Sequence, residues 1–92
     1  MITVKVAYVG SAATVVGTSE ENVQVGTATL RELWTVLFKR HGEAFEGLVS
    51  VDTDLSAYVV LLNGRNIRLL NGLDTPLQDG DRITIMAPFA GG

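Results

Sequence analysis

Residues 29–42 read TLRELWTVLFKRHG and carry the one clear helical period in the chain. Thr29, with Glu32 three residues later, forms a capping box, in which the hydroxyl and the carboxylate each satisfy a free amide at the start of a helix. Gly42 is well placed for a left-handed exit at the other end. This stretch predicts one amphipathic helix of about three turns. Its apolar stripe comprises Leu30, Leu33, Trp34, Leu37 and His41.

The residues before this helix predict an N-terminal hairpin. Apolar and polar side chains alternate over residues 2–9, the two-residue period of a strand with one face on a core. Residues 10–19 are rich in glycine, alanine and threonine and predict a loop, or a loop with a short strand at 14–16. A second alternating run at 22–25 predicts the return strand.

The residues after the helix predict three further strands. Residues 58–62 (YVVLL) are followed by Asn63-Gly64, a strong hairpin signal because both residue types tolerate positive φ. The return strand is expected at 65–69. A turn-rich stretch then leads to a last β-rich run at 82–87.

A hairpin, one helix and three more strands can share a core only if the helix lies across one face of a mixed sheet. Strands that the helix links and that become neighbours would run parallel, through a right-handed crossover. We therefore predict an α+β chain with the β-grasp (ubiquitin-like) fold, in which a mixed sheet of about five strands is crossed by one main helix. We expect residues 1–92 to form a single domain, with a flexible tail at 88–92.

Composition excludes several classes of protein. A net charge of −3 without a basic stripe argues against nucleic acid as a partner. No apolar run approaches the roughly 20 residues that cross a bilayer, and no secretory signal is recognisable, so we expect no membrane association and a cytoplasmic location. The sequence has no cysteine and therefore no side-chain thiol to carry sulfur.

The familiar signatures of catalysis are absent from the sequence. It has no P-loop, no cysteine nucleophile and a single histidine. His41 is expected to stabilise the negative end of the helix dipole rather than to act in catalysis. The pairs Asp52/Asp54 and Asp79/Asp81 lack the rest of a calcium loop and predict solvated turn residues. We expect no metal and no bound cofactor, and interpret the chain as a carrier or substrate rather than an enzyme.

The sequence ends in Gly91-Gly92, directly after a predicted strand. A main-chain carboxylate is ionised at neutral pH and is a poor electrophile, but a partner that uses ATP could convert it to an acyl-adenylate. Two residues without a β-carbon would let this end enter a narrow channel, and Pro88 would stiffen its exit from the sheet. The alternative is a flexible end without a function.

The order of motifs toward the end resembles the ThiS/MoaD family of ubiquitin-like sulfur carriers, especially MoaD-like members, the CysO type and the small archaeal modifier proteins. The motifs are Asn63-Gly64, Gly72-Leu73, Asp79-Gly80-Asp81, alternating Ile83 and Ile85, and Pro88-Phe89-Ala90-Gly91-Gly92. The helix start Leu30-Arg31-Glu32-Leu33 also fits. The family often has valine where Phe89 stands and a second proline where Ala87 stands, so the identity of the cognate partner remains open.

The resemblance implies that Gly92, preceded by Gly91, is adenylated by a ubiquitin-activating-type adenylyltransferase (MoeB/ThiF-like) and converted to a thiocarboxylate. It further implies a sulfur donor and an acceptor, such as a MoaE-like large subunit in molybdopterin synthesis. Protein modification through Gly92, or sulfur supply for thiamin or cysteine synthesis, are the alternatives within the family. A non-catalytic β-grasp interaction module is the alternative of another class.

Residues 58–62 are apolar at every position, although one face of a helix-covered sheet should meet water. Either loops cover the second face, or that face docks the activating enzyme and the acceptor. On the second reading Met86, Pro88, Phe89 and Ala90 contact the partner beside the tail.

Overall fold

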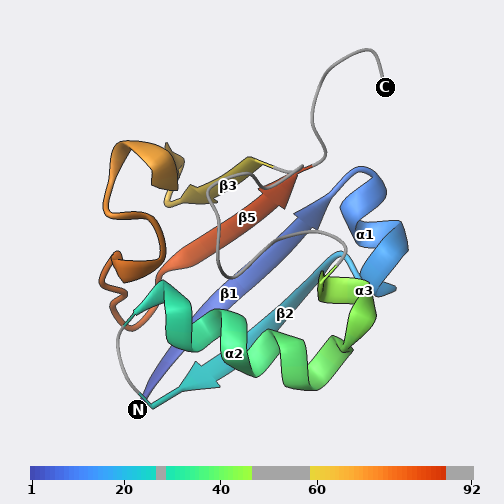
Figure 1. Ribbon diagram of the computed structural model, residues 1–92, viewed down its shortest axis with the longest axis horizontal. Helices are drawn as coiled ribbons and strands as arrows, with labels where there is room; N and C mark the ends of the chain where they lie inside the picture. The colour runs from blue at the N-terminus through green and yellow to red at the C-terminus, as the bar shows by residue number, and fades with distance from the viewer. Residues whose placement is uncertain (27–28, 47–58, 87–92) are drawn as a thin grey trace.

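A computed structural model describes residues 1–26, 29–46 and 59–86 (Figure 1). The predicted tail at 88–92, most of the expected irregular segment at 43–57, and Tyr58 and Ala87 lie outside the described residues. The strands are β1 Ile2–Val9, β2 Glu20–Val25, β3 Val59–Leu62, β4 Arg65–Asn66 and β5 Arg82–Met86. The helices are α1 Ser11–Val16, α2 Leu30–His41 and α3 Glu43–Glu46, and two 3-10 turns are η1 Ile67–Leu69 and η2 Gly72–Asp74.

The five strands form one mixed sheet in the order β2-β1-β5-β3-β4. β1 pairs antiparallel with β2 and parallel with β5, while β3 pairs antiparallel with both β5 and β4. The last strand of the chain therefore lies in the middle of the sheet, between the first strand and β3. This confirms the predicted β-grasp architecture.

α2 lies diagonally across one face of the sheet (Figure 1). Four of the five stripe residues are buried, against alternate residues of β1, β2, β3 and β5, and His41 is half-buried. Trp34 and Phe38 each make an edge-to-face contact with the fully buried Phe45 of α3. The core comprises Val4, Val6, Tyr8, Ala12, Val23, Val25, Leu30, Leu33, Trp34, Leu37, Phe45, Val60, Leu62, Leu77, Ile83 and Ile85.

The predicted ends of α2 are nearly correct. The Thr29 hydroxyl accepts a bond from the Glu32 amide at 3.4 Å, so the N-cap is confirmed. Gly42 ends the helix with φ 61° as expected, but its ψ of −134° takes it out of the left-handed helical region. The exit therefore leads straight into α3 rather than into a reversing turn.

Two predicted segments are wrong. Residues 11–16 form α1, not a loop or a strand, because the fully buried Ala12 packs one side of this turn onto the core. The strand expected at 65–69 ends after Asn66, whose side chain accepts a bond from the Arg68 amide and turns the backbone into η1. The hairpin turn itself is confirmed, with φ of 50° at Asn63 and 89° at Gly64.

Candidate functional site

The tail residues Gly91 and Gly92, with Ala90, Phe89 and Pro88, lie outside the described residues. Met86 is the one predicted site residue that the structure places. It is the last residue of β5, where it pairs with Val9 of β1 and Val59 of β3. The chain thus leaves the sheet from an interior strand that is held on both sides. The predicted site begins at this point.

The strand that leads to Met86 starts from the Asp79-Gly80-Asp81 turn. Gly80 has φ 89°, as predicted. The Asp79 carboxylate accepts a bond from the Thr3 amide at 2.8 Å, and the Gly80 amide donates to the Thr3 carbonyl at 2.8 Å. The turn is exposed, as expected, but it is bonded to the first strand rather than merely solvated.

Asp81 and Asn63 join the same turn to the β3–β4 hairpin. One Asp81 oxygen accepts from the Asn63 side chain at 2.9 Å, and the other accepts from the Gln78 amide at 2.7 Å. The Asn63 side-chain oxygen in turn accepts from the Arg82 amide at 2.9 Å. These bonds fix the start of β5 against both of its neighbours, and so fix the position from which the tail leaves.

The sheet face opposite α2 is apolar next to Met86. On this face the register aligns Val9, Met86 and Val59 in one row, and Ala7, Thr84 and Leu61 in the next. We call these six residues the exit patch. Val9 is 43% exposed, Met86, Val59, Thr84 and Leu61 are half-buried, and Ala7 is buried.

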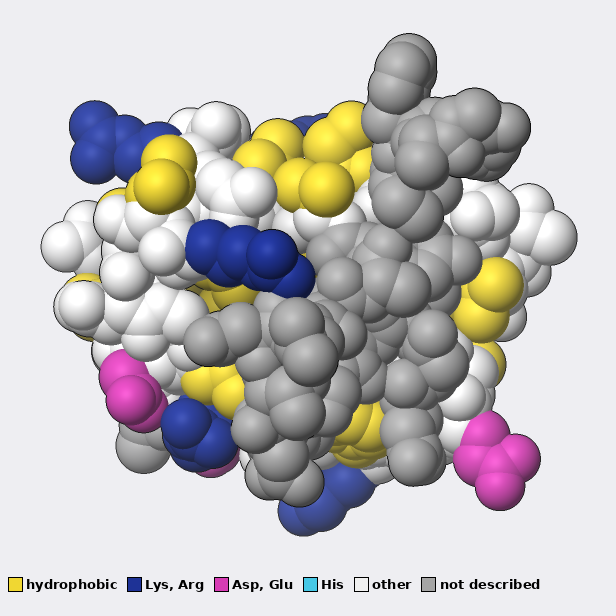
Figure 2. All heavy atoms as spheres, turned by 45° about the horizontal axis from the view of Figure 1, so that its top comes forward, with side chains coloured by type: hydrophobic (Ala, Val, Ile, Leu, Met, Phe, Trp, Pro, Cys, Tyr) yellow, Lys and Arg dark blue, Asp and Glu magenta, His cyan; other side chains and the backbone are white. Residues whose placement is uncertain are grey.

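Charge on this face lies beyond the exit patch. The next row along β1 and β5 pairs Lys5 with Arg82. Figure 2 is tipped from the view of Figure 1, in which α2 lies in front of the sheet, and shows hydrophobic side chains at the upper edge with Lys and Arg side chains to the left of them. Met86 pairs with Val59 of β3 at this end of the sheet, but its predicted role in partner binding stays a prediction. The predicted contribution of Phe89 stays a prediction.

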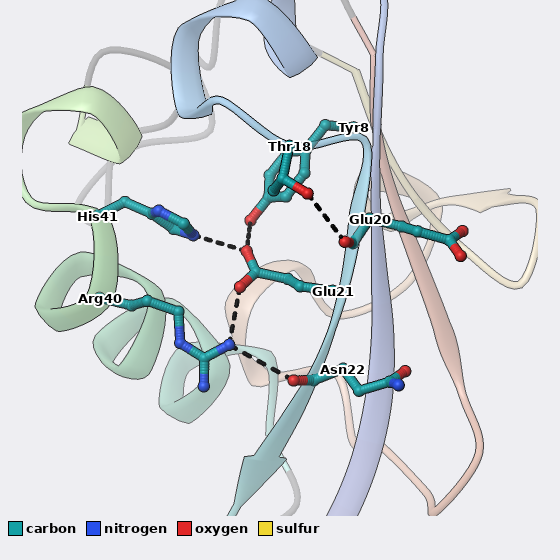
Figure 3. Close-up of polar contacts among 7 residues, drawn as sticks. All are labelled: Tyr8, Thr18, Glu20, Glu21, Asn22, Arg40 and His41. Atoms are coloured by element: carbon teal, nitrogen blue, oxygen red, sulfur yellow. Dashed lines mark hydrogen bonds and ion pairs between the residues drawn. The ribbon is translucent and has the colours of Figure 1, made fainter.

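His41 belongs to a separate polar cluster on the helix side of the sheet (Figure 3). Glu21 of β2 is its centre. One Glu21 oxygen lies 2.6 Å from His41 Nε2 and accepts the Tyr8 hydroxyl at 2.7 Å, while the other accepts from Arg40 at 2.7 Å. The Tyr8 and His41 rings also meet edge to face. Each group already has a partner within the fold, which supports the predicted structural role of His41.

The environment shifts two pKa values in this cluster. Burial alone would raise the pKa of Glu21, but hydrogen bonds from Tyr8, Arg40 and His41 outweigh it and lower that pKa below its usual range. Burial, helped by the bond to the Glu21 carboxylate, raises the pKa of Tyr8. This cluster is not predicted from the sequence. Its signal was an acidic residue at a core-facing position, since Glu21 shares a face with Val23 and Val25.

Within residues 1–26, 29–46 and 59–86, no group of three or more His, Asp or Glu side chains could hold a metal ion. In the same ranges no helix has the length and apolar character to cross a membrane.

A model of the ThiS family matches residues 6–92. A relative from Archaeoglobus fulgidus, provisionally named a sulfur carrier protein, is 34% identical over 65 residues, which cover 70% of this chain and 74% of the relative. The family model therefore spans the Asp-Gly-Asp turn and the final glycines.

Three solved structures share the fold over almost their whole length. Small archaeal modifier protein 1 from Methanosarcina acetivorans is 27% identical with a TM-score of 0.78, covering 100% of this chain and 98% of that one. A chain of the BexX/CysO complex from Amycolatopsis orientalis is 28% identical with a TM-score of 0.76, covering 97% and 99%. A protein from Pyrococcus furiosus, provisionally named molybdopterin converting factor subunit 1, is 26% identical with a TM-score of 0.74, covering 96% and 99%.

Proposed function

The chain belongs to the ThiS family of ubiquitin-like sulfur carriers, and we propose that its own Gly92 carboxylate is adenylated and converted to a thiocarboxylate for sulfur transfer. The observation that carries the proposal is the extent of the family match, which runs through Gly91 and Gly92. The structure adds that β5, the strand before them, is fixed in the middle of the sheet.

The proposed chemistry needs a partner because an ionised carboxylate does not react with a sulfur nucleophile. The carboxylate oxygen attacks the α-phosphorus of ATP and displaces pyrophosphate, which gives an acyl-adenylate. Hydrosulfide, or its equivalent from a donor protein, then attacks the carbonyl carbon, and AMP leaves. The activating enzyme holds the ATP and supplies the catalytic groups, so this chain acts as the substrate.

The exit patch is the proposed docking surface for the activating enzyme and the acceptor. Its row of exposed Val9 and half-buried Met86 and Val59 offers apolar area, and the tail starts within that row. Binding there would place the tail at the entrance of the partner's channel. A relative's chain occurs in a complex with a second protein, which supports partner binding as the mode of action.

Our first candidate is that the chain acts as the small subunit of a molybdopterin synthase, and the similarity to the Pyrococcus furiosus structure supports it. The structural similarity does not select it strongly, because the archaeal modifier and the CysO complex match equally well. Protein modification through Gly92 is therefore the second candidate. Both functions use the same activated carboxylate and differ in what attacks it.

Intact-mass measurement of protein from its native cell tests the proposal. Exchange of one oxygen for sulfur at Gly92 is expected, and it should disappear on deletion of Gly92 and persist in the control variant Lys39→Ala. Lys39 is exposed on α2. Branched Gly-Gly remnants on lysines of other proteins would instead show conjugation. If neither the thiocarboxylate nor the Gly-Gly remnants are found under any growth condition, the proposal is contradicted and a plain interaction module is favoured.

A further inference from the structure

The polar cluster around Glu21 lies beside β2, the longer of the two edge strands in the part of the chain that the structure describes. β2 is an edge strand of six residues, whereas the opposite edge, β4, has only two. An edge strand exposes unpaired N–H and C=O groups that can pair with another chain.

The register shows which groups of β2 point outward. The Tyr8 amide donates to the Ser19 carbonyl at 2.8 Å, so odd-numbered residues on the β2 side face β1. Antiparallel ladders alternate, and the backbone groups of Glu20, Asn22 and Gln24 therefore face away from the sheet. These three residues form the free edge.

Two of the three outward carbonyls already have partners within the molecule (Figure 3). The Thr18 hydroxyl donates to the Glu20 carbonyl at 3.1 Å. The Arg40 guanidinium donates to the Asn22 carbonyl over a longer 3.4 Å. Arg40 is held there by its 2.7 Å bond to Glu21. The guanidinium thus lies at the edge, where an added strand would have to approach.

We propose that Arg40 and Thr18 shield the β2 edge from pairing with β2 of a second copy of this chain, and that Glu21 anchors Arg40 for this purpose. Two β2 strands can meet antiparallel about a two-fold axis at Asn22. Glu20 of each strand then faces Gln24 of the other, and no like charges lie opposite. All three outward residues exchange their backbone bonds in this register. A second copy therefore fits this edge as soon as it is uncovered.

The test compares the self-association of wild-type protein with that of Arg40→Ala combined with Thr18→Val, by sedimentation and by amide hydrogen exchange. Wild type should be monomeric. The variant should self-associate roughly tenfold more tightly, because the Glu20 and Asn22 carbonyls lose their side-chain donors and become free to pair with a second copy. The Asn22 and Gln24 amides of the variant should become protected from hydrogen exchange as it self-associates. Lys39→Ala, on the same helical turn as Arg40, is the matched control and should stay monomeric.

Adding Asn22→Glu to the double variant tests the register. Within one chain the new carboxylate lies opposite Lys5 of β1. In the dimer it also lies opposite the same carboxylate of the second copy, so charge repulsion should restore the monomer. Self-association that survives this change occurs elsewhere and overturns the proposal. A folded double variant that stays monomeric with unprotected amides overturns it as well. If loss of Arg40 prevents folding, Thr18→Val alone carries the test, because it leaves the Arg40–Glu21 pair intact.

Discussion

Asn63 shows how one residue can serve two turns. Its positive φ makes the β3–β4 hairpin, and its side chain bonds to Asp81 and to the Arg82 amide across the sheet. The sequence predicts the first role, because Asn-Gly is a local signal. It does not predict the second, because Asn63 and Asp81 are distant in the chain and their contact depends on the fold.

Gly80 provides the prediction at this scale. Its φ of 89° is a conformation that L side chains rarely adopt, although a β-carbon there would meet no atom within 4 Å. Gly80→Ala should therefore lower the free energy of unfolding by about 1 to 2 kcal/mol through backbone strain alone. Gly26 also has open space but no positive φ, so Gly26→Ala is the matched control and should be nearly neutral. Urea unfolding measures both. Equal effects would rule out strain as the cause.

At the scale of elements, long periodic segments are predictable from the sequence and short inserted ones are not. α2 was predicted because its cap and its apolar stripe agree. α1 was missed because Thr14, Val15 and Val16 favour strands locally, while burial of Ala12 against the core decides for a helix. The end of β4 was missed although Asn66 could have signalled a turn, since an Asn side chain often bonds an amide two residues on.

β3 carries the prediction for docking. Val59 is half-buried beside Met86 in the exit patch, so Val59→Asp would place a charge in the proposed interface. For this variant, the kcat/KM of adenylation by the cognate activating enzyme, measured by ATP–pyrophosphate exchange, should fall about tenfold or more. Gln24→Asp places the same charge on an exposed residue of β2 and should change little. Melting curves check that both variants fold. Wild-type kinetics for folded Val59→Asp would contradict docking at this patch.

For the whole molecule, the Glu21 cluster makes stability depend on pH because it ties α2 to the far edge of the sheet. The folded-state pKa of Glu21 is lowered, so its contribution is fully present above the unfolded pKa of about 4.5 and is lost as pH falls through the folded value. The folded-state pKa of Tyr8 is raised, so its contribution is present below about 10 and is lost as pH rises beyond it.

Urea unfolding of Glu21→Gln at several pH values measures the acid side of this dependence. The variant should be less stable than wild type near neutral pH, and the difference should narrow below about pH 4.5. Glu20→Gln is the control, because Glu20 is exposed on the same strand and its one ion pair, with Lys5, spans 3.9 Å. The difference in unfolding free energy between Glu20→Gln and wild type should not change with pH. A constant gap for Glu21→Gln would show that its carboxylate has the same pKa in both states.

The interior position of β5 has a mechanical consequence. Any pull on the residues beyond Met86 is directed along a strand that is bonded to β1 on one side and to β3 on the other. Such a load is shared by both ladders in shear, whereas a pull on an edge strand would unzip it one bond at a time. A force applied beyond Met86 should therefore be resisted by both ladders at once.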